Sequence, residues 1–358
     1  MLRIEFHNRE KEIKEIMNSI NTQPTQIMFI YGPINSGKTA LIDHIIKKLP
    51  EKYRVFYINL RGRFIKDYDE FLKVLFDIEY KERLEKIKEV LKPIAKIMPE
   101  SYAGIPIPKD LFLKLFEKKE VEDAFVYIET VFRTLQENGF IPILLIDELQ
   151  VIGDIKIDEL LVYKLFNFLV RLTKELHISH VFAITSDSLF IERVYSEAML
   201  QGRCEYLLVD DFEKETTFKL LEKYNFKEEN KSIAWHYCGG KPVCLISIIK
   251  AKPEVERKAR ELLKDRLGFI KSNLKMLKEL GGTVDIKGNI YKVEYEKVIN
   301  ALKKFKEKDI VGFDEVDEEI KFYLVKNNVL FVDPRNDLLK PQSKLDLIAI
   351  REIIGMNE

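Results

Sequence analysis

The sequence has few cysteines, no long apolar run and no excess of charge of either sign. Its three cysteines, Cys204, Cys238 and Cys244, include no pair at a common zinc spacing, and their odd count is typical of a reducing cytoplasm. No stretch reaches the roughly 18 apolar residues of a membrane-spanning helix, and the N-terminal stretch is too charged for a signal peptide. We therefore expect a cytoplasmic protein that does not associate with membranes.

The balance of charge limits the partners that the chain can attract. It has 59 basic and 59 acidic side chains, so no global positive field favours nucleic acid or anionic lipid, although a local basic patch remains open. With 358 residues, 46% of them hydrophobic, the chain is long enough for two or three domains with buried cores.

Apolar runs alternate with helical periodicity in the first 211 residues. This pattern predicts a doubly wound parallel sheet with helices on both faces, a three-layer αβα arrangement. The first helix follows Asn8, a plausible N-cap, and residues 65–120 predict a helical insertion with an amphipathic helix over 80–98 and a loop over 101–110. The expected strands are 26–31, 54–60, 141–148, 180–186 and 204–212, and the expected later helices are 121–137 and 162–176.

Strand patterns become rare after residue 211. Residues 212–268 predict a small helical lid domain, and residues 269–358 predict helices at 269–280, 291–308, 315–327 and 343–354. Two short strands flank residues 334–337, and helices followed by such a hairpin are typical of a winged helix-turn-helix. We expect three domains: residues 1–211 with the insertion, 212–268 and 269–358.

The stretch "YGPINSGKTALI" (31–42) carries the pattern Gly32-x-x-x-x-Gly37-Lys38-Thr39. A glycine-rich loop between a buried strand and a helix aims backbone N–H groups at phosphate oxygens. Lys38 is then expected to bridge the β- and γ-phosphates, and the Thr39 hydroxyl to ligate Mg²⁺. The expected nucleotide-binding residues of this loop are Gly32, Pro33, Ile34, Asn35, Ser36, Gly37, Lys38, Thr39 and Ala40.

A second half-site is expected where "ILLIDE" ends another buried strand. Asp147 would hold Mg²⁺, directly or through water, and Glu148 would polarise the attacking water. The adjacent glutamate is typical of hydrolysing, motor and switch ATPases, and less so of simple GTPases and small-metabolite kinases. No Asn/Thr-Lys-x-Asp motif for reading guanine is present, so we expect ATP and Mg²⁺ as the ligands.

Six motifs in this order resemble the archaeal ATPase family of STAND-type P-loop ATPases, relatives of the AAA+ and origin-recognition ATPases. The resemblance covers residues 4 to about 250 and implies a P-loop NTPase fold of the ASCE type. The motifs are "FHNREKEI" (6–13), the P-loop, "LLIDELQVI" (144–152) with its trailing Gln150, "FAITSDS" (182–188), "LQGRCEYLLVDDF" (200–212) and "CGGKPVCL" (238–245).

The resemblance also implies roles for residues outside the P-loop. Arg9 and Glu10 would shape the adenine pocket, Arg203 would contact phosphate in cis as part of the catalytic set, and Pro242 would pack near the base. Each has a plainer alternative: Arg9 pairing with acids on its own helix, Arg203 as a surface arginine, and Gly239-Gly240 as a helix-breaking turn.

The sensor of the γ-phosphate is assigned less closely. Thr185 or Ser186 would serve as this polar sensor, but the family more often has Gly-Ser where this chain has Thr185-Ser186-Asp187. The sensor assignment therefore stays open between the two.

The resemblance implies a slow ATP-hydrolysing switch in which the lid and winged helix close on the core, with an unknown protein partner. The alternative is a DNA-dependent ATPase or DNA-binding protein in replication, repair or mobile-element maintenance, acting through the winged helix. Against it, residues 269–358 carry 16 basic and 16 acidic side chains, although residues 291–308 have six lysines and three glutamates. A small-molecule kinase would need more than Arg61 and Arg63 beside the phosphates.

Overall fold

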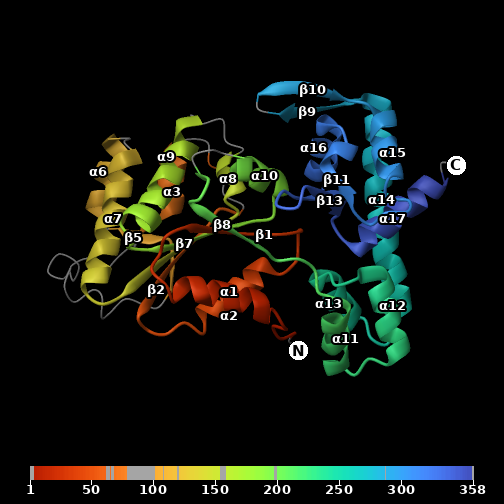
Figure 1. The fold of residues 1–358 in the computed structure, drawn as a ribbon, viewed down its shortest axis with the longest axis horizontal. Helices are drawn as coiled ribbons and strands as arrows, with labels where there is room; N and C mark the ends of the chain where they lie inside the picture. The colour runs from red at the N-terminus through yellow and green to blue at the C-terminus, as the bar shows by residue number, and fades with distance from the viewer. Residues whose placement is uncertain are drawn as a thin grey trace.

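The computed structural model has an α/β core followed by a mainly helical C-terminal half (Figure 1). The structure describes residues 4–61, 65, 68–78, 101–107, 109–118, 121–153, 159–196, 200–286 and 288–356.

The core is built on a six-stranded sheet in which every neighbouring pair is parallel. Parallel strands that are covered on both faces need continuous apolar sequence, which explains the unbroken hydrophobic runs. In sheet order the strands are β4 (Ser101–Ala103), β2 (Tyr53–Asn59), β6 (Ile141–Asp147), β7 (His180–Thr185), β1 (Ile27–Tyr31) and β8 (Cys204–Leu208).

Helices cover both faces of this sheet and give the expected three layers. Helices α1 (Glu10–Ile20) and α2 (Lys38–Ile46) bury their apolar side chains against one face. The opposite face packs against α7 (Val121–Glu137), α9 (Glu159–Val170) and α10 (Ser188–Ser196), with α3 (Tyr68–Leu75) and α6 (Lys109–Lys118) extending that layer. Figure 1 shows α1 and α2 below the sheet, α9 above it, and α6 and α7 at its left-hand end. A π-helical turn (Arg171–Glu175) follows α9.

The expected strands and helices of the core are confirmed to within a few residues, with three differences. Strand β8 ends at Leu208 rather than at residue 212, because the chain leaves the sheet for the C-terminal half. The N-cap of α1 is Arg9, in the left-handed region at φ 81°, and not Asn8. The expected loop over 101–110 contains β4, and β5 (Ile105–Ile107) pairs with β3 (Phe76–Ile78). The amphipathic helix expected over 80–98 lies outside the described residues.

The C-terminal half begins with α11 (Lys214–Lys223), α12 (Glu228–Cys238) and α13 (Pro242–Lys250), which share one apolar core. We call residues 255–356 the C-terminal module. It runs through α14 (Val255–Leu280), a hairpin of β9 (Gly282–Ile286) and β10 (Asn289–Val293), α15 (Tyr295–Lys303), β11 (Val311–Gly312), α16 (Glu318–Lys326), β12 (Leu330–Asp333), β13 (Leu338–Pro341) and α17 (Lys344–Met356).

Two expectations for this half are not met. The boundary expected between residues 268 and 269 falls inside α14, one continuous helix of 26 residues. The helix expected over 291–308 starts at Tyr295, because residues 289–293 form β10. The two strands expected around residues 334–337 are confirmed as β12 and β13, which pair antiparallel, and β13 also pairs with β11.

Candidate nucleotide-binding site

The P-loop (Gly32–Thr39) joins the carboxyl end of β1 to the N-terminus of α2. Gly32 has φ 156°, and a Cβ there would lie 2.2 Å from the carbonyl oxygen of Val209, so only glycine fits. Gly37 and Asn35 also have positive φ values, 96° and 61°. These residues turn the loop tightly, and the start of α2 adds its positive end, so the loop is shaped to bind phosphate.

Lys38 lies buried within this loop. Its Nζ donates to the carbonyl oxygens of Gly32 and Pro33, each at 2.9 Å. Burial lowers the pKa of Lys38 to about 8, and the nearby positive charge of Lys241 acts in the same direction. A buried ammonium group beside a second cation favours a bound anion.

Asp147 and Thr39 meet at the carboxyl edge of the sheet. Thr39 Oγ1 lies 3.4 Å from Asp147 Oδ2, which also accepts a 2.6 Å bond from the Tyr57 hydroxyl. Burial raises the pKa of Asp147, and the Tyr57 hydrogen bond opposes this shift. One hydroxyl and one carboxylate fit Mg²⁺, which prefers oxygen ligands and takes most of them from water and phosphate. When bound there, Mg²⁺ would neutralise phosphate charge.

Glu148 follows β6 in the left-handed region, at φ 60°, a conformation that is uncommon outside glycine and clusters at functional sites. Both of its carboxylate oxygens are engaged. Arg61 donates to Oε1 from Nη2 and from Nε, the latter at 3.1 Å, and Gln150 Nε2 donates to Oε2. Gln150 Oε1 in turn accepts from Thr185 Oγ1 at 2.6 Å. Thr185, at the end of β7, is therefore linked to Glu148 through Gln150.

Arg9 connects the P-loop to the segment that leads into the C-terminal half. Its Nη2 donates to the carbonyl oxygens of Ser36 at 2.7 Å and Asp210 at 2.6 Å. Its guanidinium also lies 4.5 Å over the Phe212 ring and pairs with Glu12 at 2.7 Å. Arg9 therefore both pairs with an acid of its own helix, Glu12, and contacts the P-loop at Ser36. Glu10 is exposed in the first turn of α1.

The turn between α12 and α13 also contacts the P-loop. Pro242 begins α13, and its Cγ lies 3.9 Å from where a Cβ of Gly37 would be. A Cβ on Gly240 would lie 1.7 Å from the Phe212 carbonyl oxygen, so this turn approaches the backbone closely. Lys241 Nζ donates to the carbonyl oxygen of Ile34 at 3.0 Å. The turn therefore meets the loop at Gly37 and Ile34.

A disulfide closes this turn. It joins Cys238 and Cys244, and Cys204 is the free cysteine. An odd cysteine count does not exclude a disulfide between two of the three, so the count was a poor guide to their pairing.

The C-terminal module also contacts the P-loop and its strand. The Ile34 N–H donates to Gln342 Oε1 at 3.2 Å, and the Tyr31 hydroxyl donates to Asp333 Oδ1 at 3.0 Å. Lys340 pairs with Asp210. The backbone of Ile34 is therefore bonded on both sides, its N–H to Gln342 and its carbonyl to Lys241.

The position of Arg203 contradicts the phosphate contact that was expected for it. Arg203 precedes β8, and its carbonyl oxygen accepts from the N–H of Ile27, the first residue of β1. The P-loop starts at the other end of β1, about 13 Å away for four residues at about 3.3 Å each. Arg203 is thus at the amino edge of the sheet, and the expected phosphate contact is wrong. Ser186 follows Thr185 at the carboxyl edge, without a bond to Glu148.

Several contacts of the site were not expected from the sequence. Lys241 and Gln150 lie inside motifs that were recognised, so a charged or amide side chain there was a signal that could have been used. Tyr57 and Gln342 carry no local sequence signal, because they reach the site only through the fold.

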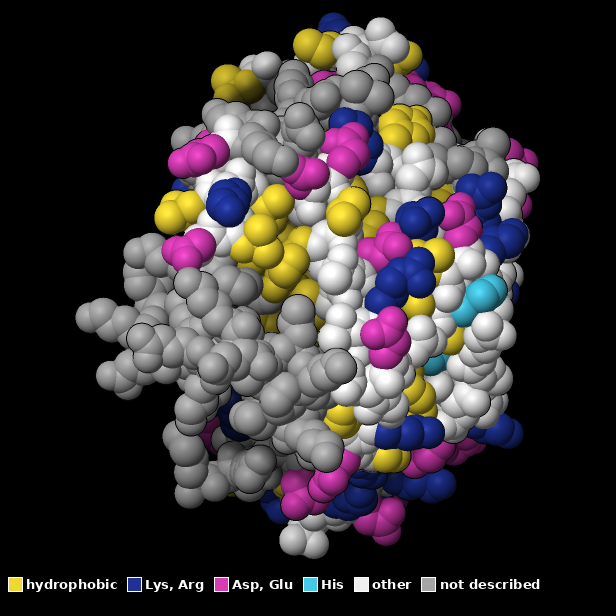
Figure 2. All heavy atoms as spheres, turned by 90° about the vertical axis from the view of Figure 1, so that its left-hand side faces the viewer, with side chains coloured by type: hydrophobic (Ala, Val, Ile, Leu, Met, Phe, Trp, Pro, Cys, Tyr) yellow, Lys and Arg dark blue, Asp and Glu magenta, His cyan; other side chains and the backbone are white. Residues whose placement is uncertain are grey.

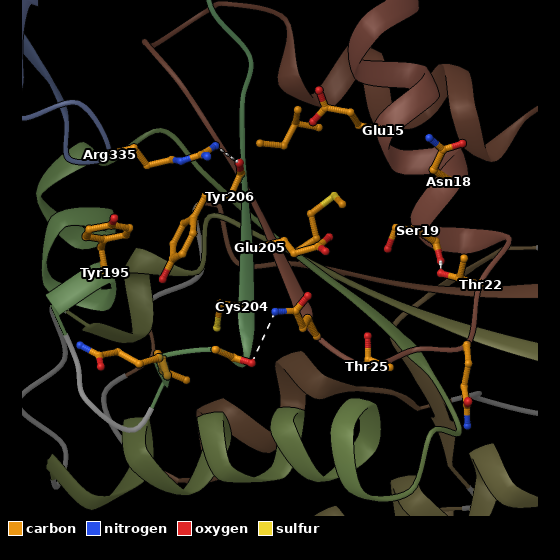
Figure 3. Close-up of a pocket in the computed structure, with 17 residues that line it drawn as sticks. Glu15, Asn18, Ser19, Thr22, Thr25, Tyr195, Cys204, Glu205, Tyr206 and Arg335 are labelled. Carbon is orange, nitrogen blue, oxygen red and sulfur yellow. Dashed lines mark hydrogen bonds between the residues drawn. The ribbon is translucent and has the colours of Figure 1, made fainter.

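A separate groove lies away from the P-loop. A groove of about 880 Å³ lies outside edge strand β8, lined on one side by α1 and the loop after it and on the other by Cys204, Glu205 and Tyr206 (Figure 3). Arg335 closes one side by donating to the carbonyl oxygen of Tyr206 at 2.8 Å. No P-loop residue lines this groove, so it is separate from the phosphate site.

This arrangement of P-loop, aspartate and glutamate at the carboxyl edge of a parallel sheet is that of a P-loop ATPase. Residues 6–248 match the family described as an ATPase domain predominantly from Archaea, and the chain belongs to that family. Residues 256–354 match the C-terminal domain of the uncharacterized ATP-binding protein MJ1010-like family.

Relatives that align along almost their whole length are also named as ATP-binding proteins. An uncharacterized ATP-binding protein of Pyrococcus abyssi is 43% identical over 99% of this chain and 100% of its own length. Another, from Methanocaldococcus jannaschii, is 44% identical over 98% of each chain. The chain is thus an archaeal ATPase-like, ATP-binding protein. No helix in the described residues is long and apolar enough to cross a membrane.

Solved structures share the fold at low identity. The Walker-type ATPase paby2304 of Pyrococcus abyssi aligns with a TM-score of 0.64 and 15% identity over 98% of this chain and 97% of that one. The ORC2 protein of Aeropyrum pernix, in its ADPNP–ADP complexes, aligns with a TM-score of 0.51 and 12% identity over 99% and 95%. These likenesses show the P-loop ATPase fold alone.

Proposed function

We propose that the protein is an ATP-binding and slowly hydrolysing switch, in which nucleotide controls the closure of its C-terminal half, as a lid and a winged helix, on the core. The observation that carries this proposal is that the backbone of one P-loop residue, Ile34, is hydrogen-bonded on both sides by the C-terminal half. Lys241 and Gln342, from two separate segments of the C-terminal half, bond the carbonyl and the N–H of Ile34. A nucleotide phosphate that alters this loop must alter both contacts, which is how a ligand biases two conformations.

The state of Glu148 supports slow turnover. A general base needs a free carboxylate oxygen beside the water that it polarises. Here both oxygens accept hydrogen bonds, from Arg61 and from Gln150. In the proposed reaction Lys38 binds the β- and γ-phosphates, Thr39 and Asp147 hold Mg²⁺, and Glu148 orients the water after one of its bonds is released. Thr185 then acts on Glu148 through Gln150.

DNA binding through a winged helix is the weaker alternative. Lys321 of α16 is 3% exposed and pairs with Glu192 of α10. Arg335, in the turn between β12 and β13, donates to the carbonyl oxygen of Tyr206. The helix and hairpin that would read DNA therefore face the core, and DNA would need the module to undock. Figure 2 shows the opposite end of the molecule, on the side of α6 and α7, where the basic and acidic side chains of the described residues are interspersed rather than gathered by sign.

Calorimetry with ATP, ADP and GTP, combined with small-angle scattering, tests the proposal. We expect ATP to bind with Mg²⁺, GTP to bind less well, and ATP and ADP to give different radii of gyration. Lys38→Ala should abolish binding, and the exposed Lys14→Ala should not. Equal radii with ATP, ADP and no nucleotide would remove the switch, whereas turnover that rises with double-stranded DNA would favour the alternative.

A further inference from the structure

The turn Gly239–Val243 contains a buried lysine, Lys241, that has no role in the reaction proposed above. The Lys241 side chain is 7% exposed, and its Nζ lies 3.0 Å from Asp211 Oδ1 and 3.0 Å from the Ile34 carbonyl oxygen. Lysine is almost never this buried unless it is paired. A turn that joins two helices does not need a buried ammonium group for its own structure.

The place of this ammonium group relative to Lys38 is informative. Lys38 Nζ bonds the carbonyl oxygens of Gly32 and Pro33, and Lys241 Nζ bonds that of Ile34, the next residue. Two cations thus sit on consecutive carbonyls of one phosphate loop. Because Lys38 is the lysine that reaches the β- and γ-phosphates in such loops, a group beside it faces the terminal phosphates rather than the base.

We propose that Lys241 is a second phosphate-binding lysine, delivered to the terminal phosphate of a nucleoside triphosphate by a turn that the Cys238–Cys244 disulfide braces. This inference rests on the proposed function, since it assumes that the P-loop binds nucleotide. Lys241 exchanges its bond to Ile34 for the γ-phosphate, and ADP offers no such group.

The brace follows from where the disulfide lies. It joins the last residue of α12 to the third residue of α13, so both ends of the turn are fixed to helices. Inside it, Gly239 adopts φ 53°, and a Cβ there would lie 2.9 Å from Cβ of Lys344 on α17. Phe212 N–H also donates to the Gly240 carbonyl oxygen at 3.0 Å. The turn is therefore held by the disulfide, by α17 and by the segment after β8, which keeps Lys241 directed at the P-loop.

Calorimetric ATP and ADP affinities of Lys241→Ala, Lys241→Arg and the control Lys250→Ala, an exposed lysine at the end of α13, test the phosphate contact. A charge-assisted hydrogen bond predicts a loss of ATP affinity of at least about tenfold for Lys241→Ala, with a much smaller loss for ADP and partial rescue by Lys241→Arg. Lys250→Ala should match the wild type.

A purely structural lysine would lower both affinities equally, and that result would overturn the inference. So would wild-type affinities in Lys241→Ala. Failure of the wild type to bind ATP would instead overturn the proposed function, so the two failures are distinct.

A double-mutant cycle tests the brace. The Cys238→Ala/Cys244→Ala variant should lose ATP affinity several-fold, and adding Lys241→Ala should cost less than it does in the wild type, because both changes act through one contact. Treatment of the wild type with a phosphine reductant should reproduce the loss without a mutation. Additive losses, or full ATP affinity after reduction, would show that the disulfide does not direct Lys241.

Discussion

The carboxyl edge of the core sheet and the C-terminal half build the site in different ways. On the core side, Lys38 and Thr39 begin α2 after the P-loop, Asp147 and Glu148 lie at the end of β6, and each belongs to a short motif. In the C-terminal half, single side chains from separate segments, such as Lys241 and Gln342, bond the backbone of one P-loop residue, Ile34. In the proposed switch, the core side therefore carries the groups for chemistry, and the C-terminal half carries the groups for coupling. Variants on the two sides should fail in different ways.

The largest effect is expected from the core side, with Glu148→Gln. Removal of the general base should lower turnover by about 10²–10⁴-fold while ATP affinity stays near that of the wild type. Steady-state phosphate release and calorimetry check the two halves of this expectation. Glu137→Gln, at the exposed end of α7, is a matched control. If Glu148→Gln hydrolyses normally, another residue activates the water.

Arg9→Ala should break the connection between the two sides. Its loss leaves the Ser36 and Asp210 carbonyl oxygens without their partner, at a cost of about 1–3 kcal/mol for each buried group. We expect a lower Tm and a loss of affinity of roughly tenfold for ATP and ADP alike, because Arg9 holds the loop and not a particular phosphate. Differential scanning calorimetry and nucleotide titration check this, with exposed Arg133→Ala as control. A loss confined to ATP would instead make Arg9 a phosphate contact.

The same contrast explains which parts of the fold and of the site could be predicted from the sequence. The sheet, the P-loop and the Asp147-Glu148 pair were predictable because strand periodicity and motif spacing are local properties. The contacts of Tyr57 and Gln342 were not, because their partners lie 90 and 308 residues away in the chain. β4 was missed because three residues between glycine and proline signals resemble a loop until a neighbouring strand pairs with them. Arg203 was misplaced because a motif gives an order along the chain and not an edge of the sheet.

Gln342→Ala should weaken docking without affecting chemistry. It removes one hydrogen bond to the Ile34 N–H and one to the Leu330 carbonyl oxygen, a neutral pair of contacts with a net contribution of roughly 1 kcal/mol each. We expect a larger radius of gyration without nucleotide and a several-fold change in ATP affinity, with turnover per bound ATP unchanged. Small-angle scattering and single-turnover kinetics check this, with exposed Gln23→Ala as control. An unchanged radius would show that docking does not depend on the P-loop contact.

The smallest effect is expected from Arg203→Ala. The motif resemblance places this arginine on phosphate, whereas the fold places it at the start of β8, where its backbone and not its side chain pairs with Ile27. We expect ATP affinity, turnover and ATP-dependent compaction all to stay within twofold of the wild type, since a surface substitution away from such a site usually changes stability by about 0.5 kcal/mol or less. Loss of compaction in Arg203→Ala would mean that this edge of the sheet approaches a nucleotide in another way, for instance on a second copy of the chain. The nucleotide site would then need a residue from a second molecule. The contrast between a core side for chemistry and a C-terminal half for coupling would have to include this contact between molecules.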